Sequence, residues 1–490
     1  MAVVHMLSRP EPAVCAARNH EMEEQMKQAH QIKSTLKKSK PVARTAGAAL
    51  LATVATSMGM GALGIVPASA TTHGATRAHS VAKVPITLWT LSSNPPEQKA
   101  ETAAINAFNK TYPGGDVTVD YVENGAYKTK IAVAMSGHNP PTMFYTWGGQ
   151  IFYAWVRAGE VMPITSQLNS DPAWKNAYLK TVWPLASYNG QIYGVPDGGP
   201  GIELMFANQA VLSKVGVNSV PTSWGQFMHA AAALKKAGLI PVSLAGATEW
   251  PEMIWLQYLT LRYGGPQVFN NIASGKAGAW NNPAILKAAA AAQTLAKDGY
   301  FEPGYSAVHW SSSQTDELMA AGKAGFQAMG DWDYGSMLNV APKFAKSSSY
   351  KFATFPTVPG GLANNAVVGE PASYYAISSK ASPAQKKEAL AFFKDVTTSR
   401  AWNVNYLEAF GNTPDDVNYA PDLLHYAGGT QNLTFFRMAQ HATYLQDYWD
   451  QNLPSAVVTP MLTDIGELFD LTMTPQKFVQ NMDAVMAKNG

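Results

Sequence analysis

The fold of this chain is decided by a stretch that opens with Val84-Pro-Ile-Thr-Leu-Trp-Thr-Leu91 and closes with Thr142-Met-Phe-Tyr-Thr-Trp147. Both segments are rich in β-branched and aromatic residues, as is Asp116-Val-Thr-Val-Asp-Tyr-Val122 between them, so we expect three strands. The spacing of apolar residues predicts helices at Glu97–Lys110 and Tyr127–Met135. Strands that alternate with helices are typical of an α/β lobe with a largely parallel sheet.

Two residues lie at the carboxyl ends of expected strands. Asn94 comes just after the end of the first strand, and Trp147 lies at the end of the third. Ligands of open α/β sheets gather at the carboxyl ends of the strands. We therefore expect Asn94 and Trp147 to face a ligand.

The remainder of the chain predicts a second lobe. Helical spacing dominates from Ser223 onward, and short apolar strands then return at Ala324–Met329, Lys351–Phe355 and Tyr374–Ile377. The absence of a long Gly/Ser linker favours lobes joined by crossing segments, for which the Gly- and Pro-rich stretches 196–208 and 355–361 are candidates. The expected organisation is a first lobe at 84–202, a second lobe at 203–355, a return to the first lobe at 356–412, and C-terminal helices at 413–490 that pack on the second lobe.

The first seventy residues have the order of a secretory signal. A lysine-rich cluster around Lys37 precedes the apolar, small-residue stretch Ala46–Val66, and Pro67-Ala-Ser-Ala70 offers a small-residue cleavage pattern. We expect residues 1–70 to be a signal peptide that is cleaved after Ala70, followed by a flexible leader at 71–83. The alternative is a retained membrane helix. Cys15 lies upstream of the apolar stretch, so it cannot carry a lipid on the mature chain, which is not an evident lipoprotein.

The low content of charged residues limits the kinds of molecule that this chain can bind. The chain has 490 residues, of which 14% are charged, and its formal net charge is +2. Nucleic acid as a partner is disfavoured, because binding phosphates requires a basic face. The single cysteine excludes a disulfide within the chain.

The sequence lacks the usual catalytic signatures. It contains no G-x-S-x-G elbow, no H-E-x-x-H zinc helix, no phosphate-binding G-x-x-x-x-G-K-[ST] and no C-x-x-C. Asp331-Trp-Asp-Tyr-Gly335 shares two positions with a calcium loop but lacks the third oxygen ligand and the distal Glu. We therefore expect no metal, no cofactor and no enzyme activity.

Several of the thirteen tryptophans lie beside a carboxylate or an amide at a Gly-rich break. Sugars suit such places, because their C–H faces stack on an indole ring while their hydroxyls need fixed donors and acceptors around the rim. A tryptophan is nevertheless often a core residue, and Trp89, Trp255 and Trp449 are left as core or surface. The candidate ligand-binding residues are Asn94, Trp147, Gly148, Trp250, Asp331, Trp332, Asp333 and Glu370; for Glu370 the alternative is an ordinary surface acid.

Nine segments in order carry a resemblance to a known family. They are Ile86–Trp89, Pro140–Trp147, Gly159–Pro163, Asn189–Pro196, Phe206–Asn208, Val220–Phe227, Gly299–Phe301, Gly322–Trp332 and Lys387–Phe393. In these segments the chain, from Ile86 to about Gly411, resembles family 1 of the extracellular solute-binding proteins, the substrate-binding proteins of carbohydrate ABC transporters.

The resemblance implies a periplasmic-binding-protein-like α/β fold of two lobes, with a hinge and a ligand cleft between the lobes. It also implies a sugar or oligosaccharide as ligand and an ABC permease in the membrane as partner. By position, Trp147 and Glu370 would lie on the first lobe, and Trp250 and Asp331-Trp332-Asp333 on the second. We expect an exported monomer, extracellular or periplasmic.

Two other functions stay open. A secreted glycoside hydrolase would need two carboxylates about 5–10 Å apart, for which Asp331 and Asp333 are the candidates. A receptor of the same fold could instead bind a polar solute that is not a sugar.

Overall fold

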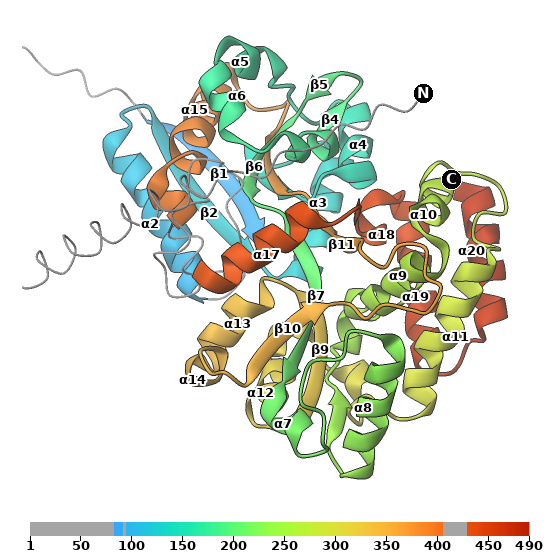
Figure 1. The fold of residues 1–490 in the computed structure, drawn as a ribbon. Helices are drawn as coiled ribbons and strands as arrows, with labels where there is room; N and C mark the ends of the chain where they lie inside the picture. The colour runs from blue at the N-terminus through green and yellow to red at the C-terminus, as the bar shows by residue number, and fades with distance from the viewer. Residues whose placement is uncertain (1–82, 92–94, 405–428, 490) are drawn as a thin grey trace, which may run out of the picture. The chain divides into compact units, whose positions relative to one another are not determined.

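The computed structural model describes residues 83–91, 95–404 and 429–489, which all fall within one compact unit, Ala78–Gly490 (Figure 1). The expected signal peptide, all of the expected leader except Lys83, and Asn94 lie outside the described residues. Cleavage after Ala70 and the role of Asn94 therefore stay predictions.

A five-stranded sheet in the order β2-β1-β3-β12-β6 defines the first lobe. Its strands are β1 (Val84–Leu91), β2 (Gly115–Val122), β3 (Met143–Thr146), β6 (Gly194–Gly198) and β12 (Ser373–Ile377). β1 is parallel to β2 over all eight of its residues and also parallel to β3. β12 is antiparallel to both β3 and β6. The three strands expected from the opening stretch are confirmed, with β12 as the one strand of opposite direction.

Helices surround this sheet, and α2, α3 and α15 contact its strands (Figure 1). Capping side chains fix their first turns. The Glu123 carboxylate accepts a hydrogen bond from Ala126 N at the start of α3, and Ser382 and Gln385 form a capping box at the start of α15. The helices of this lobe are α2 (Pro95–Thr111), α3 (Asn124–Ser136), α4 (Gly149–Arg157), α5 (Thr165–Ser170), α6 (Pro172–Ala177) and α15 (Pro383–Phe392).

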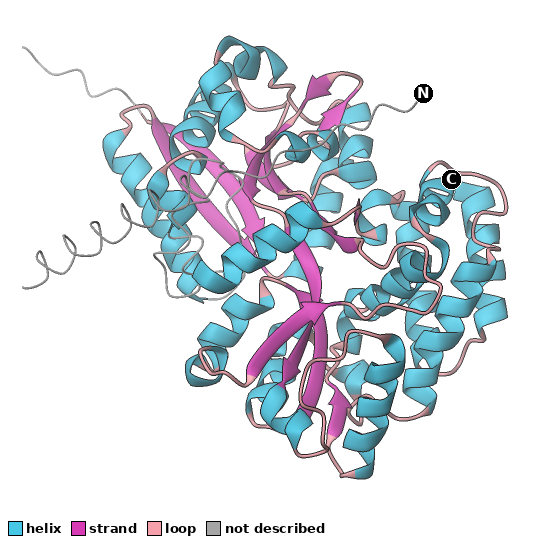
Figure 2. Cartoon of the chain, in the orientation of Figure 1, coloured by secondary structure: helices cyan, strands magenta, loops and turns pink. Residues whose placement is uncertain are grey.

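A second sheet in the order β13-β11-β7-β9-β8 defines the second lobe, with β10 paired to β7. Its strands are β7 (Gly201–Asn208), β8 (Ile240–Val242), β9 (Ala324–Gly330), β10 (Tyr350–Thr354), β11 (Val367–Glu370) and β13 (Leu445–Gln446). All eight residues of β7 are buried, because strands pair on both sides of β7 and helices cover the sheet (Figure 2).

The second lobe is the more helical one. The sequence did not decide whether Trp255 and Trp449 are core or surface residues, and the structure buries both fully in the core of this lobe. The C-terminal helices α19 and α20 contact α9 and α11 and share that core. The helices are α7 (Gln209–Ser213), α8 (Trp224–Lys236), α9 (Trp250–Gly264), α10 (Pro266–Ala273), α11 (Pro283–Lys297), α12 (Gln314–Ala320), α13 (Asp333–Val340), α14 (Pro342–Ala345), α17 (Gly429–His441), α18 (Trp449–Asn452), α19 (Ser455–Phe469) and α20 (Pro475–Asn489).

Two short crossings connect the sheets. The chain passes from β6 to β7 at Gly199-Pro200, within the stretch 196–208 expected to cross, and it returns from β11 to β12 at Pro371-Ala372. The crossings run side by side, since Glu370 pairs with Gly201 and Ser373 pairs with Gly198.

The second crossing corrects two expectations. Glu370 ends β11 of the second sheet and does not lie on the first lobe, because the return expected at 356–412 begins only at Pro371. The stretch 355–361 stays in the second lobe, where the Thr357 amide donates to Thr222 O and Arg262 binds the carbonyls of Phe355 and Pro356. Composition alone could not separate this Gly- and Pro-rich loop from a true crossing, because both need the same backbone freedom.

Candidate ligand-binding site

A pocket lies where the crossings meet the two lobes, and it encloses about 1160 Å³ of space, including the part open to solvent. From the first lobe it is lined by the ends of β1 and β3, with Thr90, Leu91, Tyr145 and Trp147. Helices α2 and α3 add Glu97, Glu101, Asn124 and Lys128. The carboxyl ends of the first parallel strands therefore open onto this pocket, as expected for an open α/β sheet.

The second lobe contributes an aromatic wall to the pocket. The ring of Trp250 lies 6.0 Å from that of Trp310 and 6.2 Å from that of Trp332, and Trp332 is 6.5 Å from Tyr448 between ring centroids. The three tryptophans are only partly buried, and all four rings line the pocket. A continuous set of indole rings at a pocket offers an apolar face to a ligand.

Trp147 is held on the first lobe by its neighbours. Its ring meets Tyr127 and Tyr145 edge-on, at 6.1 and 5.0 Å between centroids. Lys128 Nζ lies 5.2 Å from the Trp147 ring and 2.9 Å from Asp450 Oδ2. Because Asp450 belongs to α18 of the second lobe, this ion pair links the two lobes at the edge of the pocket.

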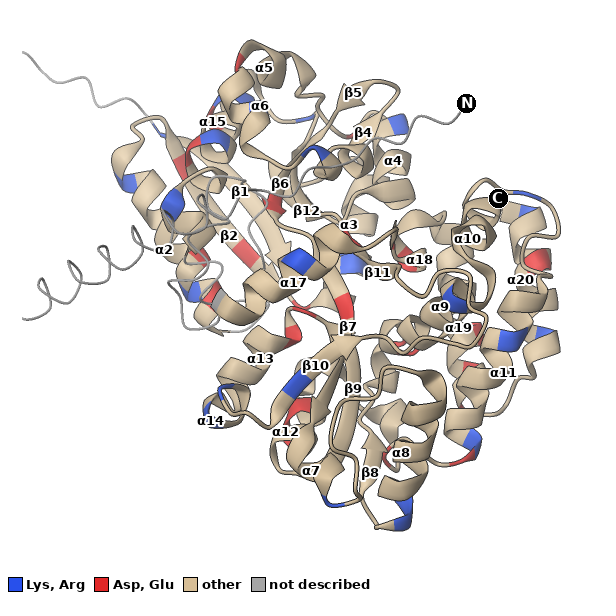
Figure 3. Ribbon diagram, viewed as in Figure 1, with Lys and Arg blue, Asp and Glu red and all other residues tan. Residues whose placement is uncertain are grey.

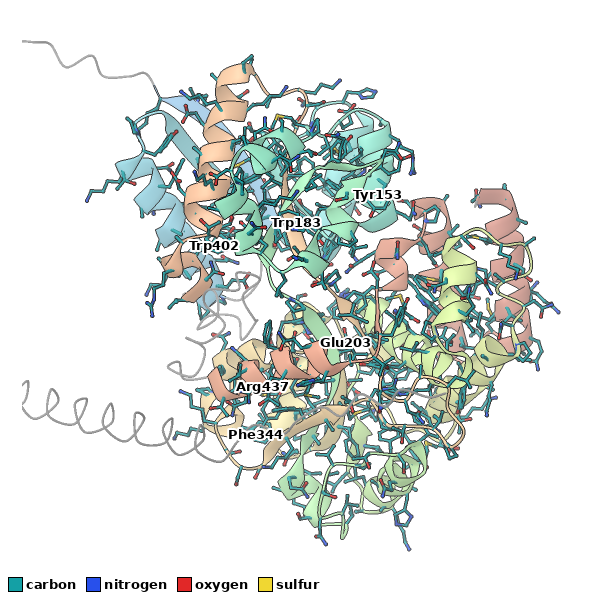
Figure 4. All side chains as sticks on the ribbon, turned by 45° about the horizontal axis from the view of Figure 1, so that its top comes forward. Tyr153, Trp183, Glu203, Phe344, Trp402 and Arg437 are labelled. Carbon is teal, nitrogen blue, oxygen red and sulfur yellow. The ribbon has the colours of Figure 1, made fainter. Side chains whose placement is uncertain are left out.

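Carboxylates lie along the crossings and behind the aromatic wall. Figure 3 shows acidic positions in red on β6 and β7, where Asp197 accepts a hydrogen bond from Ser373 Oγ at 2.7 Å and Glu203 accepts one from Tyr448 OH at 2.6 Å. Figure 4 labels Glu203 on β7. Glu101 on α2 accepts a hydrogen bond from Tyr375 OH at 2.6 Å.

Burial raises the pKa of these acids. It brings the pKa of Glu101 and of Asp197 to about 7, and the pKa of Glu203 to about 8. Burial, with Asp447 nearby, also holds the pKa of Glu370 well above its ordinary value. Such perturbed carboxyl groups are typical of functional pockets, although structural networks also produce them.

Several known proteins resemble this chain in sequence or in fold. The family model described as bacterial extracellular solute-binding protein matches residues 92–401. The chain belongs to this family. Among its relatives are the xylose/arabinose-binding protein of Haloferax volcanii, 22% identical over 269 residues, and the glucose-binding protein of Saccharolobus solfataricus, 24% identical over 244 residues. These matches cover 54% and 47% of the chain, and the chain spans about half the length of the two relatives, 56% and 43%.

Solved structures share the fold of this solute-binding protein. A structure from work on xylan utilization by Caldanaerobius polysaccharolyticus matches with a TM-score of 0.75 at 24% identity, covering 82% of this chain and 99% of that one. A chitin oligosaccharide binding protein also matches with a TM-score of 0.75, at 22% identity, covering 83% and 99%. The two-lobed α/β fold expected from the sequence is confirmed.

Four of the eight residues expected to bind ligand line the pocket of this solute-binding protein: Trp147, Trp250, Trp332 and Glu370. Gly148 instead lies behind the pocket at the start of α4, with a positive φ of 78°, and an added Cβ would come within 2.5 Å of Leu185 O. That position needs glycine for its backbone. The ligand contacts of all eight residues stay predictions.

The two aspartates beside Trp332 do not line the pocket. Asp331 is buried, and neither of its carboxylate oxygens has a hydrogen-bond partner among the described residues. Asp333 accepts hydrogen bonds from Gln327 Nε2 at 3.1 Å and Tyr350 OH at 3.0 Å in the interior of the second lobe. The pattern of an acid beside a tryptophan therefore leads here to a ring that lines the pocket and to two acids that do not.

Several pocket residues of this solute-binding protein were missed from the sequence: Glu97, Glu101, Lys128, Trp310, Tyr448 and Asp450. A signal was present for some of them. Glu97 and Glu101 are four apart on the helix that follows the first strand, so they share one face of it. Tyr448-Trp-Asp450 also places a tryptophan beside an acid, but there Trp449 is the core residue and its two neighbours line the pocket.

The described residues contain neither a membrane-spanning helix nor a metal-binding cluster. In this part of the chain, no helix is long and apolar enough to span a membrane. The same residues include no group of three or more His, Cys, Asp or Glu side chains placed to hold a metal ion.

The raised pKa values predict that the protein loses stability as pH rises. Burial raises the pKa of Asp331 and of Glu203 to about 8, from 3.8 and 4.5. Between about pH 4 and pH 8 the folded state thus binds more protons than the unfolded state. The contribution of these two acids to the free energy of unfolding is therefore complete below about pH 4 and is lost as the pH rises through 8. We expect the melting temperature to fall by at least a few degrees between pH 5 and pH 9.

Circular dichroism melts across that pH range would measure this fall. Asp331→Asn should flatten the slope, because the amide does not titrate. A melting temperature that rises toward pH 9 would contradict the prediction.

Proposed function

We propose that this protein is an extracellular receptor that captures a sugar or oligosaccharide between its lobes and delivers it to an ABC permease. The observation that carries the proposal is that Trp147 of the first lobe shares one pocket with Trp250, Trp310 and Trp332 of the second. The carboxylates of Glu101, Glu370 and Asp450 line the same pocket. Rings that stack on C–H faces, with acids that accept from hydroxyls, supply both parts of sugar recognition.

The relatives support a sugar as the ligand. Their names specify xylose or arabinose, glucose and chitin oligosaccharide. The hydrolase alternative finds no support, since its candidate pair of carboxylates does not line the pocket and Asp333 is bound to Gln327 and Tyr350. Members of the family are binding proteins.

The paired crossings favour capture by hinge closure. Between the described lobes the β6–β7 and β11–β12 connections lie side by side, with a register shift at Ser373/Tyr374. Gly369 allows the strands to approach closely, since an added Cβ would lie only 2.1 Å from Gly201 O. A pair of strand crossings beside the pocket is a suitable place for the change in backbone angles that closes a binding protein.

Export completes the proposal. The family is extracellular, and the leader 1–70 would direct the chain out of the cell before it is removed. The mature receptor would act as a monomer without a cofactor, either free outside the cell or in a periplasm, and present its closed form to the permease.

A ligand screen tests the proposed function. The purified protein is heated with pentoses, hexoses and their short oligomers, because a ligand that binds only the folded state raises the melting temperature. A sugar that raises it, and whose Kd is then measured by calorimetry, supports the receptor. Release of the chromophore from aryl glycosides would instead support a hydrolase, and binding of non-sugar polar solutes alone would refute the sugar.

A further inference from the structure

The pocket is lined by more acidic than basic residues. Its lining includes four acids and one basic residue among the described residues, namely Glu97, Glu101, Glu370 and Asp450 with Lys128. The ammonium group of Lys128 already lies 2.9 Å from Asp450 Oδ2 and over the face of Trp147. The cation of the pocket is therefore engaged by the protein itself, and it does not balance the charge of Glu370.

Hydrogen-bond acceptors are also in excess on one side of the pocket. Asp450 Oδ1, Gln451 Oε1 and Glu370 Oε2 are buried atoms without a donor among the described residues. Asp450 and Gln451 are 4% and 8% exposed, and all three side chains line the pocket. Buried acceptors without partners are costly, so a ligand that fits here must bring donors to these oxygens.

We propose, on the basis of the proposed function, that the ligand is an amino sugar whose protonated amine binds between Glu370 and Asp450 while its ring stacks on the tryptophan wall. An ammonium group brings three donors and a positive charge on one atom. A hydroxyl brings one donor and no charge, so it would leave the acids of the pocket uncompensated when water is excluded.

The surroundings of Glu370 favour a positively charged ligand group. Burial and, after it, the charge of Asp447 hold the pKa of Glu370 well above its ordinary value, with smaller contributions from Asp197 and Asp450, whereas a hydrogen bond with the Gln451 side chain acts in the opposite direction. A cation beside Glu370 would offset the repulsion between these acids. Indole faces also attract ammonium groups, which adds to the same preference.

Other cations fit less well. A metal ion lacks a suitable set of ligands, since the described residues hold no group of three or more placed to bind one. An amino acid would bring a carboxylate that needs a basic partner, and Lys128 is already bound to Asp450. The tryptophan wall provides the surface on which a sugar ring, more than a thin polyamine chain, would stack.

Calorimetry with matched sugars tests this inference. D-glucosamine, D-galactosamine and β-1,4-linked glucosamine oligomers are compared with their N-acetylated and 2-hydroxyl parents, at a pH where the amines are protonated. We expect the best amine to bind roughly 10-fold or more tightly than its neutral parents, as a charge-assisted hydrogen bond implies. Glu370→Gln keeps the shape of the side chain and should reduce this preference to about 3-fold or less. Glu317→Gln, an exposed acid on α12 outside the pocket, should leave the preference unchanged.

Each other outcome overturns the inference in a distinct way. If neutral sugars bind as tightly as the amines, the ammonium site is refuted and the proposed sugar receptor is still supported. If a polyamine such as spermidine binds more tightly than any amino sugar, the ammonium site is supported and a sugar as its ligand is refuted. Binding of none of these compounds would refute the amino sugar alone, because the proposed function is tested separately by the screen of pentoses, hexoses and their oligomers.

Discussion

Replacing Trp332 by alanine is expected to weaken the binding of a sugar ligand roughly 5- to 150-fold, which corresponds to about 1–3 kcal/mol of lost ring burial. Trp332 occupies the middle of the aromatic wall, between Trp250 and Tyr448. Its removal would interrupt the stacking surface and leave a gap that neither neighbour can fill without breaking its own contacts.

The backbone holds this ring in place. An added Cβ on Gly330 would lie 2.3 Å from Trp332 Cη2, and one on Gly201 would lie 3.2 Å from Cζ3. The indole therefore rests against two glycines, one at the end of β9 and one at the crossing into β7. A platform that is rigid before the ligand arrives loses little conformational entropy on binding, which is why we expect the full loss of affinity on truncation.

Calorimetry with a sugar identified by the thermal screen measures this effect. Trp332→Phe, which keeps a smaller ring, should give an intermediate Kd. Trp224→Ala is the matched control, because Trp224 is also partly buried in the second lobe but packs on Phe227 and Phe355 away from the pocket. An unchanged Kd in Trp332→Ala would remove Trp332 from the binding surface and weaken the assignment of the pocket.

The sequence predicts the fold well where local periodicity is decisive. β1 and β2 alternate or carry β-branched residues, so their period of two can be read directly. The return strand β11 is different, because it is only four residues long and ends in Gly-Glu. Its pairing with β7 depends on two glycines that allow close approach, Gly201 and Gly369, and such a long-range contact leaves no periodic signal.

The site is predictable only in part, because adjacent residues need not share a direction. Trp332 lines the pocket, whereas Asp333 begins α13 and bonds to Tyr350 in the interior. At Tyr448-Trp449-Asp450 the reverse holds, with the ring in the core and its neighbours at the pocket. A tryptophan beside an acid thus indicates a place in the chain, and only tertiary packing decides which side chain reaches the ligand.

Replacing Arg262 by methionine is expected to cost about 3–5 kcal/mol of folding free energy. The Arg262 side chain is fully buried on α9, and no carboxylate lies within ion-pair distance of it among the described residues. Its guanidinium donates instead to four main-chain carbonyls of one loop, those of Phe355, Pro356, Ala363 and Ala366. Methionine fills a similar volume but donates nothing, so all four carbonyls would be left without this donor.

This loop leads directly into β11, which carries Glu370 to the pocket. Arg262→Met should therefore also weaken ligand binding, although Arg262 does not line the pocket. Arg262→Lys keeps the charge but cannot match the planar fork of five donors. Its folding free energy should therefore lie between those of the parent protein and Arg262→Met. Urea unfolding measures the stability. The control is Arg157→Met at an exposed arginine on α4, which should change the stability little.

A free energy of unfolding of Arg262→Met within about 0.5 kcal/mol of that of the parent protein would contradict the prediction. The four hydrogen bonds would then not be what fixes the position of β11. The position of Glu370 in the pocket would then need another cause.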